Sequence, residues 1–305
     1  MRLAGATRVQ LDQMTLPGAV WQGPGAITPS TQDATGTFSV RADLLDIRDL
    51  IGFGTHATID LRTSSYEVDR RGFQSVDLAS SGDVRIFDGG LTTTGNLVVT
   101  AAQLYPVTGA RGTLMAGYRT PDPDDGITGF APGSVLSIRR HGSEDAAMPY
   151  TVFGSLSLAA ETIEQGGVVR APLGHLLLGS TDAASNTERV ILLPGSISSV
   201  SAAGLTLPYG GTVDGLTYQY GGKPVTIQGV GASDAGGIRV TARHVDAQAG
   251  SVLDLSGGGA LTGAGFVAGR GGSVDVLTTP LANANPVNGY SLSLIHISEP
   301  TRQEA

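Results

Sequence analysis

Hydrophobic and polar positions alternate along much of the chain, in short runs that begin with glycine. One pattern recurs four times: a glycine, apolar residues two and four positions later, an alanine at the sixth position and an aliphatic residue at the ninth. It starts at Gly36, Gly95, Gly154 and Gly236. The spacings of 59, 59 and 82 residues predict a structural unit of about 20 residues, with three, three and four units between successive glycines.

Further runs that begin with glycine lie between these four, at residues 54–61, 133–138, 174–178 and 250–255. Apolar and small polar residues alternate within them, with the period of two that indicates a strand with one buried face. No window of a dozen residues carries a sustained helical stripe, and glycine and proline interrupt the chain too often for long helices. The sequence therefore predicts an all-β protein.

Two all-β architectures fit short strands at a regular spacing. A sandwich or barrel needs antiparallel hairpins, whereas a β-solenoid stacks each coil of the chain on the previous one in parallel. The solenoid explains why similar residues recur at multiples of one unit, and its narrow interior suits a chain with only 5% aromatic residues. We therefore predict a parallel β-helix (β-solenoid) with extruded loops.

The pattern divides the chain into three parts. Residues 1–35 are expected to be irregular or to form partial coils, and residues 36–291 to form the β-helix. Loops are expected to leave it near 115–152, 209–222 and 256–272, with one regular coil at 133–138 inside the first. Residues 292–305 break every pattern before them and resemble the translation of a sequencing adaptor. We expect this tail to be non-native, and the chain to be a fragment of a longer protein.

Composition excludes several classes of protein. The absence of cysteine excludes a disulfide scaffold and a metal site with cysteine ligands. A formal charge of −8 with a single lysine, Lys223, argues against a nucleic-acid partner. No run of 18 apolar residues exists, so the sequence predicts no transmembrane helix and no membrane insertion.

Several segments resemble the exoproteins of the filamentous haemagglutinin type, which are large bacterial adhesins exported by two-partner secretion. The coils at 154–163 and 237–245 carry the resemblance, and so does the block of 250–259 followed by 266–276. It covers roughly residues 36–290. It implies a right-handed parallel β-helix, export through an outer-membrane two-partner secretion transporter, and an extracellular rod on the bacterial cell surface. A signal peptide and the N-terminal secretion domain of the family are not seen in this sequence.

Candidate reactive groups are scattered. Asp122, Asp124 and Asp125 lie in a loop of proline and glycine that lacks the spacing of a calcium site. The histidines that precede the tail occur singly, without a pair at metal-binding spacing, at His56, His141, His175 and His244.

Other motifs also have structural explanations. The glycine-rich run 257–272 lacks a phosphate-binding signature, and the basic pair 139–140 is balanced at once by Glu144 and Asp145. Tyr209, Tyr218 and Tyr220 could stack on a sugar or on one another. The sequence therefore predicts no catalytic residue, no cofactor and no metal.

Two classes of function follow from these observations. In the first, the chain is a non-catalytic adhesin fragment that displays loops to an unspecified host-cell or surface receptor; the stem of a contact-dependent toxin or haemolysin is a variant of it. In the second, the chain is a β-helical polysaccharide lyase or hydrolase. An enzyme needs acidic and basic side chains that converge on one face of a sheet, and their scatter along the sequence disfavours it.

Overall fold

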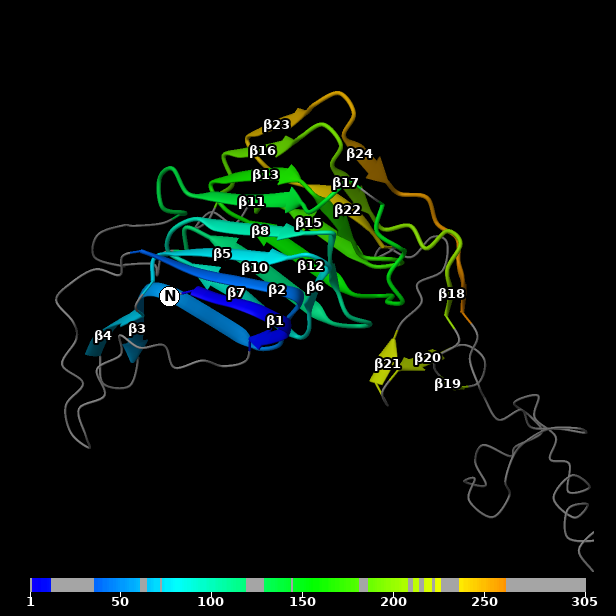
Figure 1. Ribbon diagram of the computed structural model, residues 1–305, viewed down its shortest axis with the longest axis horizontal. Coiled ribbons are helices and arrows are strands. Elements are labelled where there is room, and N and C mark those ends of the chain that lie inside the picture. The colour runs from blue at the N-terminus through cyan, green and yellow to red at the C-terminus, as the bar shows by residue number, and fades with distance from the viewer. Residues whose placement is uncertain are drawn as a thin grey trace, which may run out of the picture. The chain divides into compact units, whose positions relative to one another are not determined.

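The computed structural model contains strands and no helix among the residues that it describes (Figure 1). These residues are 2–11, 36–60, 65–71, 73–118, 129–143, 145–180, 186–207, 211–213, 217–220, 223–225 and 236–261. The chain divides into two units. The first comprises residues 1–205 and 228–259, and the second comprises residues 206–227 and 260–305.

In the first unit the chain winds repeatedly through two sheets of mainly parallel strands. The two arms of the larger sheet, which meet at one long strand, are called the first and second faces, the smaller sheet is called the third face, and one passage through the three faces is a coil. The first face stacks β2 (Thr37–Ile47), β5 (Ser75–Ser80), β8 (Leu97–Ala101), β11 (Val135–Arg140), β13 (Thr162–Gly166), β16 (Arg189–Leu192) and β23 (His244–Ala247). Most of these strands are visible one above another in Figure 1. The predicted all-β, solenoid-like stack of parallel strands is therefore observed.

The second face continues from the carboxyl half of β2, because β5 and β6 both pair with that long strand. It contains β6 (Asp83–Ile86), β9 (Gln103–Pro106), β14 (Val168–Arg170), β17 (Ile197–Ser199) and β24 (Val252–Asp254). The coil that begins with β11 contributes no strand to this face, so β9 pairs directly with β14. Residues 142–143 and 145–153 of that coil form a loop, which we call the strap.

The third face stacks β3 (Leu50–Asp60), β7 (Gly89–Thr93), β10 (Arg111–Ala116), β12 (Ser155–Ala159), β15 (His175–Leu178) and β22 (Gly237–Val240). Two strands extend the unit at its amino-terminal end. β1 (Arg2–Leu11) lies parallel to β2, and β4 (Ser65–Arg71) lies antiparallel to β3. Residues 1–35 were expected to be irregular or to form partial coils; residues 2–11 of this region form the strand β1, whereas residues 12–35 lie outside the described residues.

The second unit contains two small sheets. β18 (Thr206–Leu207) pairs in parallel with β25 (Ala260–Leu261). β19 (Gly211–Val213), β20 (Thr217–Tyr220) and β21 (Lys223–Val225) form an antiparallel sheet in the region where the sequence predicts the second loop. Residues 262–305, which include the end of the third loop and the predicted adaptor-derived tail, lie outside the described residues.

The core of the first unit consists of columns of side chains from successive coils. Parallel strands in register place equivalent residues directly above one another, so aliphatic side chains stack on aliphatic side chains. One column on the first face runs through Phe38, Val76, Leu97, Leu136, Ile163 and Val190. All six are at most 1% exposed, so the alternating pattern of the sequence accounts for the core.

The structure corrects the predicted repeat unit. Phe38 and Leu97, which follow Gly36 and Gly95, lie two coils apart on the first face, rather than three units apart. Gly154 begins a strand of the third face, so Leu156 does not stack on Leu97. Ile238 stacks on Leu176 and thereby lies two coils, not four, from Leu156. The two equal spacings are a coincidence of loop lengths.

Candidate functional site

The second face gathers polar side chains that are far apart in the sequence. Its strands place Asp46 beside Arg85 and Arg85 beside Tyr105. The pairing of Leu104 with Val169 continues this row to Arg170, which pairs with Ser199, which in turn pairs with Asp254. We call the row of Asp46, Arg85, Tyr105, Arg170, Ser199 and Asp254 the second-face ladder. The ladder thus brings four charged side chains, those of Asp46, Arg85, Arg170 and Asp254, into one row of the stack.

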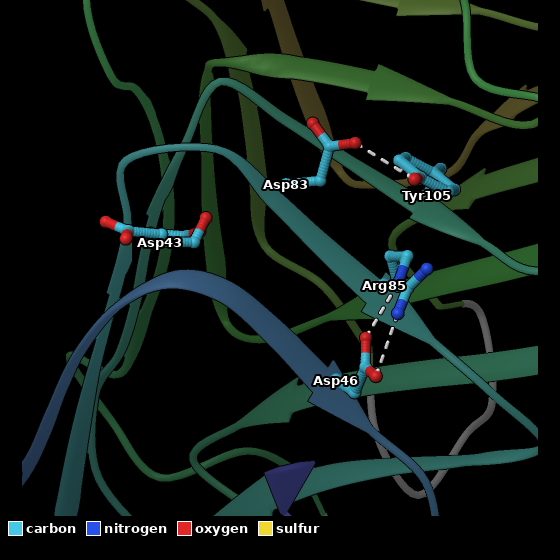
Figure 2. A network of polar contacts seen from close by, with 6 residues as sticks. Asp43, Asp46, Asp83, Arg85 and Tyr105 are labelled. Carbon is cyan, nitrogen blue, oxygen red and sulfur yellow. Dashed lines mark hydrogen bonds and ion pairs between the residues drawn. The ribbon is translucent and has the colours of Figure 1, made fainter. Parts of the chain in front are cut away.

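A bidentate ion pair opens the ladder (Figure 2). Arg85 donates from Nε to Oδ1 of Asp46 at 2.7 Å and from its terminal nitrogen to Oδ2 at 2.9 Å. Asp46 is fully buried, whereas the Arg85 side chain is 28% exposed. The hydrogen bond to Asp46 raises the pKa of Arg85 above its ordinary value. The Arg48 guanidinium lies 4.3 Å from the centre of the Phe87 ring, which also contacts Arg85.

A second buried contact joins neighbouring coils beside this pair. The hydroxyl of Tyr105 donates to Oδ2 of Asp83 at 2.9 Å (Figure 2), and Tyr105 is only 9% exposed. Burial, and then the negative charge of Asp83, raise the pKa of the Tyr105 phenol well above its ordinary value near 10. The phenol therefore stays neutral at physiological pH and acts as a hydrogen-bond donor.

This raised pKa predicts a loss of stability in alkali. Folding favours the neutral phenol, so the contribution of Tyr105 is complete below about pH 10 and is lost as the pH rises toward its folded-state pKa. We expect the unfolding free energy to fall as the pH rises from about 10 to about 12, and to fall less in Tyr105→Phe. Denaturant unfolding of both proteins across this range measures the difference. Equal pH dependence in the two proteins would contradict the assignment.

The strap covers the middle of the ladder. Gln103 donates to the carbonyl of Ala147 at 3.0 Å, and Thr151 donates to the carbonyl of Pro106 at 2.8 Å. The terminal nitrogen of Arg170 lies 3.2 Å from the sulfur of Met148. Gln103 is only 3% exposed although it alternates with inward residues along β9, because the strap takes the place of solvent there.

Further charged groups lie next to the strap and at the last strands of the ladder. Arg140 forms a 2.6 Å ion pair with Asp145 at the start of the strap. Burial lowers the pKa of Arg170, against the opposing effect of Asp145 and Asp254. Hydrogen bonds from Ser256, and then from Ser199, lower the pKa of Asp254. Asp46, Asp83 and Asp254 thus each accept a hydrogen bond from a neighbouring side chain, a pattern that ties coils together.

The structure does not bring the sequence-predicted reactive groups together. His141 is exposed beyond β11 on the first face, His175 is half-buried on β15 of the third face, and His244 is exposed on β23. Nε2 of His244 lies 3.6 Å from Glu188. His56 lies on β3, and only its backbone is described. Within the described ranges, no three histidine, aspartate or glutamate side chains form a group that could hold a metal ion.

Other candidates fall partly outside the described residues. Asp122, Asp124, Asp125 and Tyr209 lie there entirely, as does most of the run 257–272. Tyr218 and Tyr220 both lie on β20 of the antiparallel sheet. The predicted neutralisation of the basic pair at 139–140 is observed for Arg140, through Asp145. In the part of the chain that the structure describes, no helix is long and apolar enough to cross a membrane.

Sequence reasoning missed the second-face ladder, although a signal for it exists. Each member directly follows an inward-facing residue of the second face, as in Leu45–Asp46, Val84–Arg85 and Leu104–Tyr105. These dipeptides align only when the register of the coils is known. The assumed unit of about 20 residues puts them out of step, since loops of different lengths separate the coils.

Comparison with known proteins adds no relative. No protein-family model matches the chain, no curated protein matches it, and no solved structure matches it.

Proposed function

We propose that the chain is a non-catalytic segment of a secreted bacterial surface adhesin, built as a right-handed parallel β-helix. The single observation that carries the proposal is the in-register parallel stacking of coils over continuous aliphatic columns. In such a stack each coil contacts only the coils next to it, so the number of coils is not fixed by the fold. This architecture suits a long scaffold that presents loops. The likeness to haemagglutinin-type exoproteins, noted from the sequence, supports export by a two-partner secretion transporter.

The loops that leave the coils are the natural contact points for a receptor. The strap is the best described of them, and Tyr150 at its surface is 78% exposed. An exposed aromatic ring on a loop held by a rigid sheet offers contact area at low entropic cost. Arg140 and Asp145 anchor one end of the strap, and Thr151 anchors the other.

The test measures attachment of the full chain. Fluorescent beads coated with folded chain are applied to cultured epithelial cells and to glass, beside beads coated with the heat-unfolded chain. We expect saturable retention that depends on folding and that Tyr150→Ala weakens. Leu50→Ala, which removes another exposed apolar side chain, 63% exposed on β3, serves as the matched control and should retain binding. Equal retention of folded and unfolded chain on every surface would overturn the proposal.

A polysaccharide lyase or hydrolase is the second candidate, and the second-face ladder favours it. Acidic and basic groups that are scattered in the sequence converge on one face of a sheet, as such enzymes require. Against it, Asp46 is buried in an ion pair and Tyr105 is held neutral. Release of reducing ends or unsaturated uronates from a panel of polysaccharides, abolished by Arg170→Gln, would establish the enzyme and exclude the non-catalytic scaffold.

A further inference from the structure

The last described coil of the first unit has open strand edges. We call β22, β23 and β24 the end coil. Each of its strands pairs with one neighbour, namely β15, β16 or β17, and no described strand pairs with its other edge. A row of backbone donors and acceptors without a neighbouring strand is a template for another strand.

Apolar side chains are also uncovered on the end coil. Val245 is 51% exposed, although Val190 directly beneath it in the same column is fully buried. Val252, Leu253 and Leu255 are 46%, 43% and 59% exposed. These four account for most of the exposed large apolar residues in the described part of the chain. Among the residues that the structure describes, no further strand lies over the core at this end.

The charges on β23 suit an antiparallel copy of the same strand. His244 and Asp246 flank Val245 on the solvent side of the first face. A two-fold axis through Val245 places His244 of one copy opposite Asp246 of the other, and the reverse. A parallel copy in register would instead place Asp246 against Asp246. Like charges on directly facing residues destabilise a pair of strands, whereas the N–H of an imidazole facing a carboxylate donates a hydrogen bond to it.

The same two-fold axis also brings strands of the second and third faces of the two copies together. Rotation about it exchanges the second and third faces, so β24 of each copy meets β22 of the other. Asp254 on β24 is negative and Arg239 on β22 is positive and exposed. We propose that two copies of this chain associate end to end through their end coils, with β23 antiparallel to β23. A two-fold contact of this kind is closed and therefore yields a dimer rather than a fibre.

Disulfide trapping tests the proposal in the full chain, which contains no cysteine of its own. Facing residues of antiparallel strands have Cα atoms about 4.5–5.5 Å apart, within the range that a disulfide spans. We expect Val245→Cys to form a disulfide-linked dimer under mild oxidation. Leu50→Cys, which is exposed on β3 at 63%, is the matched control and should form little. Equal crosslinking of both variants, or none at Val245, would overturn the proposal.

Sedimentation of the full chain gives the second measurement. We expect a dimer that dissociates on dilution, a monomer for Asp246→Arg, and recovery of the dimer when His244→Asp is added. Circular dichroism shows that each variant is folded. A full chain that sediments as a monomer overturns the proposal. If dimers form only after residues 262–305 are removed, the proposal is also overturned, because that segment then covers the end coil in the full chain. A ladder of ever larger species overturns the closed two-fold contact.

Discussion

Replacement of Arg85 by Met is expected to lower the unfolding free energy by about 3–5 kcal/mol. The substitution keeps much of the side-chain volume but leaves the fully buried Asp46 carboxylate without the guanidinium that binds both its oxygens. Removing one partner of a buried ion pair is costly because the other charge remains out of water. Urea unfolding followed by circular dichroism measures the change.

Arg41→Met is the matched control for this prediction. Arg41 forms a 2.6 Å ion pair with Asp77, a diagonal neighbour on the next strand of the first face, so this pair also joins neighbouring coils. The side chains of Arg41 and Asp77 are 39% and 29% exposed, so water screens their charges. We therefore expect the unfolding free energy to fall by only about 0–1 kcal/mol. Equal losses in the two variants would show that the burial of Asp46 does not govern the energetics.

Substitution of Gly179 by Ala is expected to lower the unfolding free energy by about 3 kcal/mol or more. A Cβ atom on Gly179 would lie 1.9 Å from the carbonyl oxygen of Thr241 on the next coil. That oxygen belongs to the backbone, so relief requires the two coils to separate. Loss of close packing between β15 and β22 should follow.

Gly195→Ala separates this clash from backbone strain. Gly179 has a φ of +93° and Gly195 a φ of +78°, both in the region that L-residues rarely adopt. A Cβ on Gly195 has nothing within 4 Å, so we expect only the conformational cost of about 1 kcal/mol. Thermal and urea unfolding of both variants provide the comparison. Similar losses would indicate that the coils are not closely apposed at Thr241.

The sequence was sufficient to predict the class of fold, because the alternation in each strand reports one buried face. It also placed strands near residues 133–138, 174–178 and 250–255, where β11, β15 and β24 lie. It could not assign strands to faces. Gly95 and Gly154 begin similar runs, yet Leu97 lies on the first face and Leu156 on the third. Local patterning carries no information about which corner of a coil a strand follows.

The ladder was beyond prediction for the same reason. Asp46, Arg85 and Tyr105 meet through register, and register depends on the lengths of loops that local sequence does not constrain. The balance of charge around Arg140 was predicted from the sequence because Asp145, with which it forms an ion pair, lies only five residues away. The pairs that join coils, such as Tyr105 with Asp83, span a whole coil and require the three-dimensional stack.

The strand omitted from the second face has a mechanical consequence. Between β8 and β13 the first face advances by two strand spacings, whereas the second face advances by one between β9 and β14. Each spacing is about 4.8 Å, so the second face is shorter than the first by one spacing over this stretch. The coils on either side of the strap must therefore tilt toward one another at the second face. Insertion of a strand-forming segment in place of the strap should remove this wedge and straighten the axis locally.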